Sequence, residues 1–287
     1  MTIYYYAFTG HKYGLDRARR AAVILKGLKA KGFNTMLLVN DFRAGLATRD
    51  LGVPESVHIE GIQDIDAIAE VGDVAIIDSP EDDHGRLVKY CSDFKHVFRF
   101  AEHDEDTSIH GETMLTIDCN SDECISSIIV DDIYFETHQK EQRTLFFLGD
   151  SDADKTILNN SDFFNATPME LLLGNYFYVK YENDLEKIFE TLHESEEYTE
   201  LICSSSRVIT ASFQTALEAK VAGAEVIFIN LSNISDKQKK LLSLLKVILI
   251  SNFNIEIFKQ IALNPVFDGD IPIERNDTIV TKIINCF

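Results

Sequence analysis

Short apolar runs alternate with amphipathic segments along most of this 287-residue chain. Runs of β-branched and aromatic residues predict strands, and apolar residues spaced three or four apart predict helices. In the first half, strands are expected at residues 3–8, 35–39, 73–77 and 96–100. The helix that starts near Asp16 carries an apolar stripe of Ala21, Ile24, Leu25 and Leu28. Strands that alternate with helices indicate βαβ units and a parallel sheet, so the predicted fold class is α/β.

A second series of the same kind follows a polar, less periodic stretch at residues 131–142. We place the domain joint there and predict domains at 1–140 and 141–287. In the second domain, strands are expected at residues 144–148, 176–179, 207–210, 226–231 and 247–250, and helices at 185–193, 215–221 and 236–245. Residues 278–284 fit either a final helix or a strand. Two Rossmann-like domains facing a cleft would bind a ligand at the carboxyl ends of their strands.

The turn after the first strand concentrates positive charge in a chain whose net charge is −20. A glycine-bearing turn that opens a helix holds anions, because its N–H groups and the positive end of the helix dipole point outward. The basic residues near this turn are Lys12, Arg17, Arg19 and Arg20. We therefore predict an anionic ligand, and the predicted binding residues are Gly10, Gly14, Arg17 and Arg20. A solvated basic face at a helix start is the alternative.

Two further residues in the first domain are candidates for proton transfer. His11 is a candidate general base because imidazole titrates near neutral pH, and a loop histidine without a role is its alternative. Asp78 follows a buried strand, and a carboxylate at the carboxyl end of a central parallel strand commonly faces the ligand. Its alternative role is to cap a helix expected at residues 82–90.

Two strand–turn–helix junctions in the second domain are candidate nucleotide sites. At the first, Gly149 permits a sharp turn before Ser151 and Asp152, although capping of the next helix explains the same residues. At the second, a strand ends at Thr210 and a helix follows. Hydroxyl and N–H groups at such a helix start suit a phosphate, and a glutamate one turn later suits sugar hydroxyls. The predicted binding residues of this junction are Ser212, Gln214, Thr215 and Glu218.

Composition narrows the class of protein. Hydrophobic residues make up 45% of the chain and charged residues 26%, which is typical of globular proteins. No apolar run approaches the roughly 20 residues that cross a bilayer, and the N-terminus lacks the features of a secretion signal. We therefore expect a soluble, cytoplasmic protein. Its net acidity argues against DNA or RNA as a partner.

The cysteines and histidines give no metal-binding pattern. Cys119 and Cys124 are spaced C-x4-C without a second pair, so we expect free thiols in a reducing compartment and no metal site. No cofactor is expected. An NAD-binding enzyme is a weaker alternative, because the first turn contains only Gly10 and Gly14 instead of G-x-G-x-x-G.

These motifs resemble those of the glycosyltransferase-B (GT-B) group, and most closely the UDP-sugar hydrolase family of pseudaminic acid synthesis. The G-x-G-H-x-x-R turn of that family falls on residues 14–20, and its hydrophobic strand that ends in Asp matches residues 75–78. Its G-G-[ST]-D turn corresponds to residues 149–152. Its nucleotide-binding strand and loop look like residues 207–212, with Glu218 at the position of the helix glutamate.

Three departures change what this resemblance implies. The histidine that the resemblance implies as catalytic base falls on Arg17, and its second glycine falls on Asp16. A permanently protonated arginine cannot accept a proton from water. The Gly-Gly turn of the second domain is Gly149-Asp150 here, and the glycine pair of the nucleotide loop is Ser212-Phe213.

The resemblance implies a sugar-nucleotide hydrolase or a glycosyltransferase-like enzyme in cell-surface glycan synthesis of the nonulosonic acid type. In this interpretation the first domain faces the sugar or acceptor and the second binds the nucleotide of a UDP-linked substrate. His11 or Asp78 would then activate the incoming water or hydroxyl. A catalytically inactive relative that binds a sugar nucleotide or a protein partner is the alternative, because the base position and the glycines differ.

Overall fold

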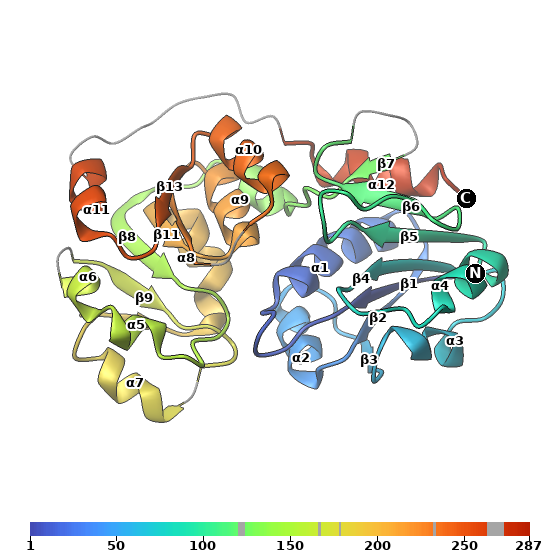
Figure 1. Cartoon of the computed structure of the whole chain (residues 1–287), viewed down its shortest axis with the longest axis horizontal. Helices are drawn as coiled ribbons and strands as arrows, with labels where there is room; N and C mark the ends of the chain where they lie inside the picture. The colour runs from blue at the N-terminus through green and yellow to red at the C-terminus, as the bar shows by residue number, and fades with distance from the viewer. Residues whose placement is uncertain (120–123, 166–167, 178, 232–233, 263–272) are drawn as a thin grey trace. The chain divides into compact units, whose positions relative to one another are not determined.

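The computed structural model describes all residues except 120–123, 166–167, 178, 232–233 and 263–272. The chain forms two compact units (Figure 1). Unit 1 comprises Met1–Asp131 and Glu274–Phe287, and unit 2 comprises Asp132–Ile273. The units therefore divide at Asp131/Asp132, whereas the sequence suggested 140/141. The last 14 residues, which the predicted boundary assigns to the second domain, belong to unit 1.

Unit 1 contains a seven-stranded parallel sheet with the order β3-β2-β1-β4-β5-β6-β7. Its strands are β1 Thr2–Ala7, β2 Asn34–Val39, β3 Ser56–His58, β4 Val74–Asp78, β5 His96–Phe100, β6 Thr113–Thr116 and β7 Cys124–Ser126. All five residues of the central strand β4 are buried, which explains its continuous apolar run. The chain reverses its direction across the sheet between β1 and β4, the place where such sheets bind ligands.

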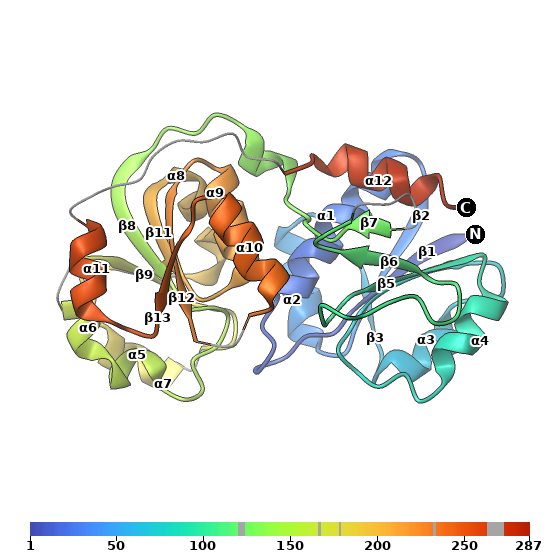
Figure 2. The same ribbon diagram turned by 45° about the horizontal axis from the view of Figure 1, so that its top comes forward.

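The helices of unit 1 are α1 Asp16–Ala30, η1 Ile62–Asp64, α2 Phe42–Asp50, α3 Ile65–Ile68, α4 Arg86–Asp93 and α12 Asn276–Ile284. The expected stripe of α1 is buried, as predicted. Helix α4 begins at Arg86, later than the expected residue 82, because Asp83 forms a turn by accepting bonds from the amides of Gly85 and Leu87. The final helix α12 packs on α1 and β7, which explains why the C-terminal residues belong to unit 1 (Figure 2).

Unit 2 contains a six-stranded parallel sheet with the order β10-β9-β8-β11-β12-β13. Its strands are β8 Glu141–Phe147, β9 Glu170–Leu172, β10 Leu192–His193, β11 Ser205–Thr210, β12 Glu225–Asn230 and β13 Ile248–Ser251. Its helices are η2 Asp132–Phe135, α5 Thr156–Asn159, α6 Ser161–Asn165, α7 Val179–Leu185, η3 Ser195–Glu197, α8 Tyr198–Ser204, α9 Phe213–Val221, α10 Asp236–Leu244 and α11 Ile255–Ala262. The reversal across this sheet lies between β8 and β11.

Two elements predicted for the second domain were wrong. The aromatic run at residues 176–179 is not a strand: the amide of Tyr176 donates to the carbonyl of Asp150 in a turn, residue 178 lies outside the described residues, and α7 starts at Val179. The helix expected at residues 185–193 is also absent, because α7 ends at Leu185 and β10 occupies Leu192–His193. Aromatic residues favour strands, but tertiary contacts decide their conformation here.

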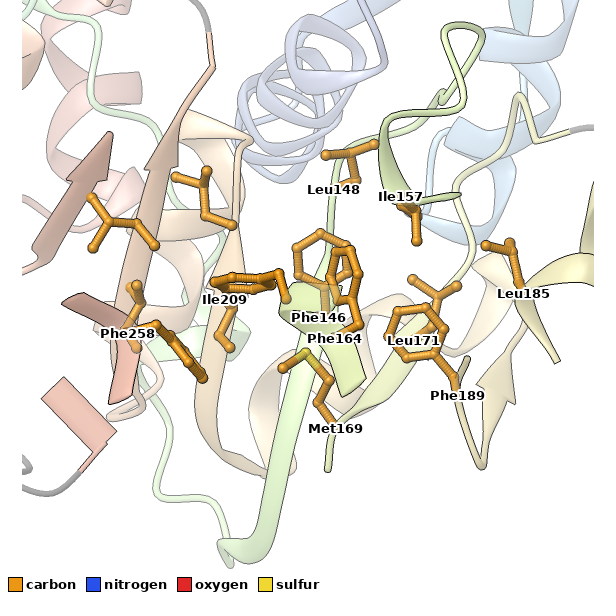
Figure 3. Close-up of a cluster of buried hydrophobic side chains, with 14 of the residues drawn as sticks. Phe146, Leu148, Ile157, Phe164, Met169, Leu171, Leu185, Phe189, Ile209 and Phe258 are labelled. Atoms are coloured by element: carbon orange, nitrogen blue, oxygen red, sulfur yellow. The ribbon is translucent and has the colours of Figure 1, made fainter. Parts of the chain in front are cut away.

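A cluster of buried hydrophobic side chains, aliphatic and aromatic, forms a core of unit 2 (Figure 3). Phe146 of β8 is fully buried, and its ring centroid lies 4.8 Å from that of Phe164 in α6. The rings of Phe163 and Phe258 are 4.9 Å apart and join α6 to α11. Such large buried rings fix the positions of the short helices α6 and α11, because each buried aromatic ring contributes extensive apolar contact.

One cysteine pair differs from the expectation of free thiols. Cys119 and Cys124 form a disulfide, so the prediction was wrong for this pair, while Cys91, Cys203 and Cys286 are free. Cys119 follows β6 by three residues, and Cys124 is the first residue of β7. None of the described helices has the length and apolar character that a bilayer-spanning helix needs.

We expect Gly27→Ala to destabilise unit 1. A Cβ at residue 27 would lie 2.6 Å from Cγ2 of Val280 and 2.8 Å from Nδ2 of Asn276 in α12. In an exposed helix, Gly→Ala would raise the free energy of unfolding by about 1 kcal/mol, whereas overpacking of a core lowers it by about 1–3 kcal/mol. Urea denaturation should therefore show a loss in wild type and a smaller loss in a Val280→Ala background. A gain in stability from Gly27→Ala would mean that α12 does not pack against α1.

Candidate functional site

Asp78 is the centre of a charged site at the carboxyl edge of the unit 1 sheet. It is the last residue of β4 and is completely buried. Nη2 of Arg20 lies 2.9 Å from each carboxylate oxygen, and Nε of Arg17 lies 3.3 Å from Oδ1. The hydroxyl of Tyr5 donates to Oδ2 at 2.9 Å. Asp78 therefore lies beside the predicted residues Arg17 and Arg20, and it does not cap α4, whose N-cap residue is Gly85.

Glu102, just after β5, completes the charge balance of this site. Nη2 of Arg17 lies 2.6 Å from its Oε2, so Arg17 bridges Glu102 and Asp78. Two arginines thus pair with two carboxylates, so the positive charge of Arg17 and Arg20 is neutralised within the site. Glu102 and Tyr5 were not among the predicted site residues, although the Phe-Ala-Glu run that begins with the last residue of β5 is the same kind of signal as the strand that ends in Asp78.

The loop after β1 has the glycine requirement that the sequence suggested. Gly10 has φ +141° and Gly14 has φ +68°, which are values that residues with a Cβ rarely adopt. The amide of Gly14 donates to the carbonyl of Gly10 at 2.8 Å and closes the loop. The amide of Thr9 donates to Oδ1 of Asn40, which ties the loop to the end of β2. His11 is exposed in this loop.

In unit 2, the four residues predicted around the start of α9 form one buried network. Ser212 is the N-cap, and its Oγ accepts the amide of Thr215 at 3.1 Å. Glu218 accepts from Nε2 of Gln214 at 2.8 Å and from the hydroxyl of Tyr198 at 2.6 Å. Tyr198 also lies 2.8 Å from Oγ1 of Thr215. The structure brings these residues together, but it directs their side chains toward one another and toward Tyr198, which is not among the predicted site residues.

In the turn after β8, Asp152 has a structural role, whereas Ser151 is a candidate ligand-binding residue. Gly149 has φ +144°, and Asp152 caps α5 by accepting the amides of Thr156 at 2.5 Å and Ile157 at 3.0 Å. Gly174 packs so closely on this turn that a Cβ would lie 2.4 Å from the Asp150 backbone. Oγ of Ser151, by contrast, is buried and has no hydrogen-bond partner among the described residues.

Asn230 provides a second such atom at the same edge of the sheet. It is the last residue of β12, and its Oδ1 is buried without a hydrogen-bond partner within the described part of the chain. Strands β8, β11 and β12 are neighbours, so Ser151 and Asn230 follow the carboxyl ends of strands that flank β11. Buried polar atoms are normally paired, so two unsatisfied ones at this edge suggest a polar ligand. An Asn that ends an apolar strand is the sequence signal that was missed.

The described residues contain no cluster of potential metal ligands. No group of three or more His, Cys, Asp or Glu side chains among them is arranged to hold a metal ion.

No protein-family model matches this sequence, and no curated protein matches it either. The structure is similar to UDP-GlcNAc 2-epimerase from Methanocaldococcus jannaschii, with a TM-score of 0.59, 10% identity and 99% of both chains covered. UDP-GlcNAc 2-epimerase from Neisseria meningitidis gives a TM-score of 0.57 and 12% identity over 100% of this chain and 99% of that chain. Spinosyn rhamnosyltransferase SpnG gives 0.63 and 10% over 100% and 95%. These similarities confirm the predicted α/β fold of GT-B type.

We expect the buried Tyr5 to lower the free energy of unfolding as the pH rises above 10. Burial, and then the Asp78 carboxylate, raise the pKa of Tyr5 well above its usual value. Above pH 10 the unfolded phenol ionises while the folded one keeps its proton, so the folded state loses up to about 1.4 kcal/mol per pH unit. Denaturation at pH 8 and pH 11 should therefore show a smaller decline for Tyr5→Phe than for wild type. Tyr13→Phe, which alters a half-exposed ring, is the control, and an equal decline in all three proteins would contradict the expectation.

Proposed function

We propose that this chain is a sugar-nucleotide enzyme in which unit 2 binds the nucleoside diphosphate. The observation that carries the proposal is a pair of buried atoms, Ser151 Oγ and Asn230 Oδ1, at the carboxyl edge of the sheet, for which the described residues provide no hydrogen-bond partner. They flank β11, which leads into α9 through the capped turn at Ser212. A helix start provides N–H groups for a phosphate, and the two side chains would add a donor and an acceptor for the rest of the ligand.

The structurally similar proteins support the ligand class. One of the structures was determined with UDP-GlcNAc and UDP, and the rhamnosyltransferase with thymidine diphosphate. We infer from the motifs that the substrate is UDP-linked and that the reaction is hydrolysis or glycosyl transfer in cell-surface glycan synthesis of the nonulosonic acid type. The proposed location is the cytoplasm.

Unit 1 would supply the groups that act on the sugar. Asp78 accepts hydrogen bonds from Arg20 and Tyr5 and forms an ion pair with Arg17, so its two oxygens are already engaged. Glu102 has Arg17 as its cationic partner, and its side chain is 22% exposed, so it is better placed to act as the base than Asp78. The base would take a proton from water or an acceptor hydroxyl, whose oxygen attacks the anomeric carbon. The diphosphate would then leave with the electron pair of the broken C–O bond.

A non-catalytic sugar-nucleotide-binding protein is the second candidate. Arg17 occupies the position at which the resemblance implies a catalytic histidine, and it is held between Asp78 and Glu102. An ion pair of this kind can be purely structural, because two carboxylates close together need cations between them. Binding without turnover would favour this candidate.

We expect Ser151→Ala to weaken UDP binding without loss of stability. Removal of a hydrogen bond to a charged ligand costs about 1.5–3 kcal/mol, which is roughly a 10- to 100-fold rise in Kd by calorimetry. Ser205→Ala is the matched control, because Ser205 Oγ is also buried and unsatisfied among the described residues but lies at the amino end of β11. It should change the Kd by less than about twofold. No binding of UDP or TDP to wild type would overturn the proposed function.

Turnover of UDP-sugars should depend on Glu102 if the chain is an enzyme. Glu102→Gln keeps a hydrogen-bonding side chain beside Arg17 but removes the base, so kcat should fall by about 10²- to 10⁴-fold with little change in UDP affinity. Glu105→Gln changes an exposed carboxylate of the same loop and should leave kcat unchanged. Product release from UDP-sugars can be followed by chromatography. Unchanged turnover in Glu102→Gln would assign the proton transfer to another group.

A further inference from the structure

A long loop links β5 to β6 and carries Glu102 near its start. Residues 101–112, all of them within the described part of the chain, contain no helix or strand. Ordering such a loop costs conformational entropy, so a functional side chain on it depends on bonds that hold the backbone in place. The position of Glu102 therefore depends on contacts that the loop makes with itself and with the strands.

Asp106 holds the start of this loop through its carboxylate. Oδ2 of Asp106 accepts the amide of Glu102 at 2.9 Å and the amide of His103 at 3.1 Å. The amide of Asp106 in turn donates to the carbonyl of His103 at 3.2 Å and closes a turn over residues 103–106. One side chain thus fixes the backbone of Glu102 and of the residue that follows it.

Arg99 of β5 connects this turn to the second half of the loop. Its Nη1 lies 4.0 Å from Oδ2 of Asp106. Its Nη2 donates to the carbonyl of Thr107 at 2.9 Å and to Oε1 of Glu112 at 3.2 Å. The guanidinium group therefore joins the two carboxylates that organise the loop, Asp106 in its first half and Glu112 at its end.

Glu112 keeps Arg99 in place. Its side chain is buried, and its two oxygens accept the amides of Ile109 at 3.1 Å and His110 at 2.8 Å. Burial disfavours the charged form, but the amide bonds and the charge of Arg99 outweigh it, so the pKa of Glu112 is lower than usual. Glu112 is thus ionised at neutral pH and pairs with Arg99 there.

The carboxylate of Glu102 is oriented separately, by α1. Nη2 of Arg17 donates to its Oε2 at 2.6 Å, and Nε donates to its Oε1 at 3.4 Å. Arg17 fixes the carboxylate, whereas Asp106 fixes the main chain from which that side chain projects. Both are needed to define one position, because a glutamate side chain has several rotatable bonds.

We propose that Asp106, supported by Arg99, is a positioning residue that holds Glu102 for proton transfer. This inference rests on the proposed function, in which Glu102 takes a proton from water or an acceptor hydroxyl. A general base must lie within hydrogen-bond reach of that proton, and a displacement of about 1 Å can lower the rate by about 10²-fold. Asp106 needs no contact with the substrate, because two amide bonds link it to the backbone at Glu102 and His103.

Replacement of Asp106 in the full chain tests this role, with a panel of UDP-N-acetylhexosamines as substrates. Asp106→Ala removes the acceptor of both amides, so kcat should fall about tenfold while KM stays within about twofold. Asp106→Asn keeps a carbonyl oxygen for the amides and should retain most of kcat. Glu105→Ala, which alters an exposed carboxylate of the same loop, is the matched control and should leave kcat unchanged.

Two further measurements separate positioning from a general loss of stability. In a Glu102→Gln background, Asp106→Ala should cause no further fall in kcat, because the group that it positions is gone. Without substrate, amide hydrogen exchange in Asp106→Ala should become faster at Glu102 and His103. Exchange at Ile109 should stay unchanged, because its amide bonds to Glu112.

Each outcome decides the proposal. Unchanged exchange at Glu102 and His103, unchanged kcat in Asp106→Ala, or an additive loss in the double variant would overturn it. A wild type that turns over no member of the panel would instead contradict the proposed function, and the positioning role with it. If Asp106→Ala fails to fold, Asp106→Glu decides: it keeps the charge but moves the acceptor by one methylene group, so kcat should fall severalfold, and an unchanged kcat would overturn the proposal.

Discussion

The buried carboxylate of Asp78 constrains most of unit 1. A carboxylate with no exposed surface needs cations and hydrogen-bond donors around it, and these come from α1 and β1. Arg17 and Arg20 are three residues apart, so the start of α1 must present one face to the end of β4. The same requirement fixes the loop between β1 and α1, where Gly10 and Gly14 adopt conformations that few other residues tolerate.

Unit 2 also contains a buried carboxylate, to which uncharged side chains donate hydrogen bonds. Glu218 is buried in α9, but its carboxylate receives bonds from a tyrosine hydroxyl and a glutamine amide. Charge is therefore balanced by ion pairs at the carboxyl edge of one sheet and by dipoles at that of the other. In the second unit, Ser212 caps the N-terminal turn of α9, where the helix dipole has its positive end.

The two units repeat one local design. In each, a glycine with φ near +140° follows the first strand of the sheet, Gly10 in unit 1 and Gly149 in unit 2. In each, the strand order reverses beside that first strand, so the glycine turn lies where parallel sheets usually bind ligands. The design accommodates different chemistry, because a cationic helix follows the first turn and an aspartate-capped helix follows the second.

Local patterns in the sequence determined the α/β class, the strands such as β4 and β12, and the helix starts of α1 and α9. These elements depend on neighbours in the chain: an apolar run, a helical stripe, or a capping serine. The tertiary structure alone decided that residues 176–179 form no strand, that α12 joins unit 1, and that Cys119 bonds Cys124. It also decided which candidate side chains are already paired. Those outcomes depend on groups far apart in the sequence, such as Glu102 beside Arg17 and Tyr198 beside Glu218, whose proximity no local pattern encodes.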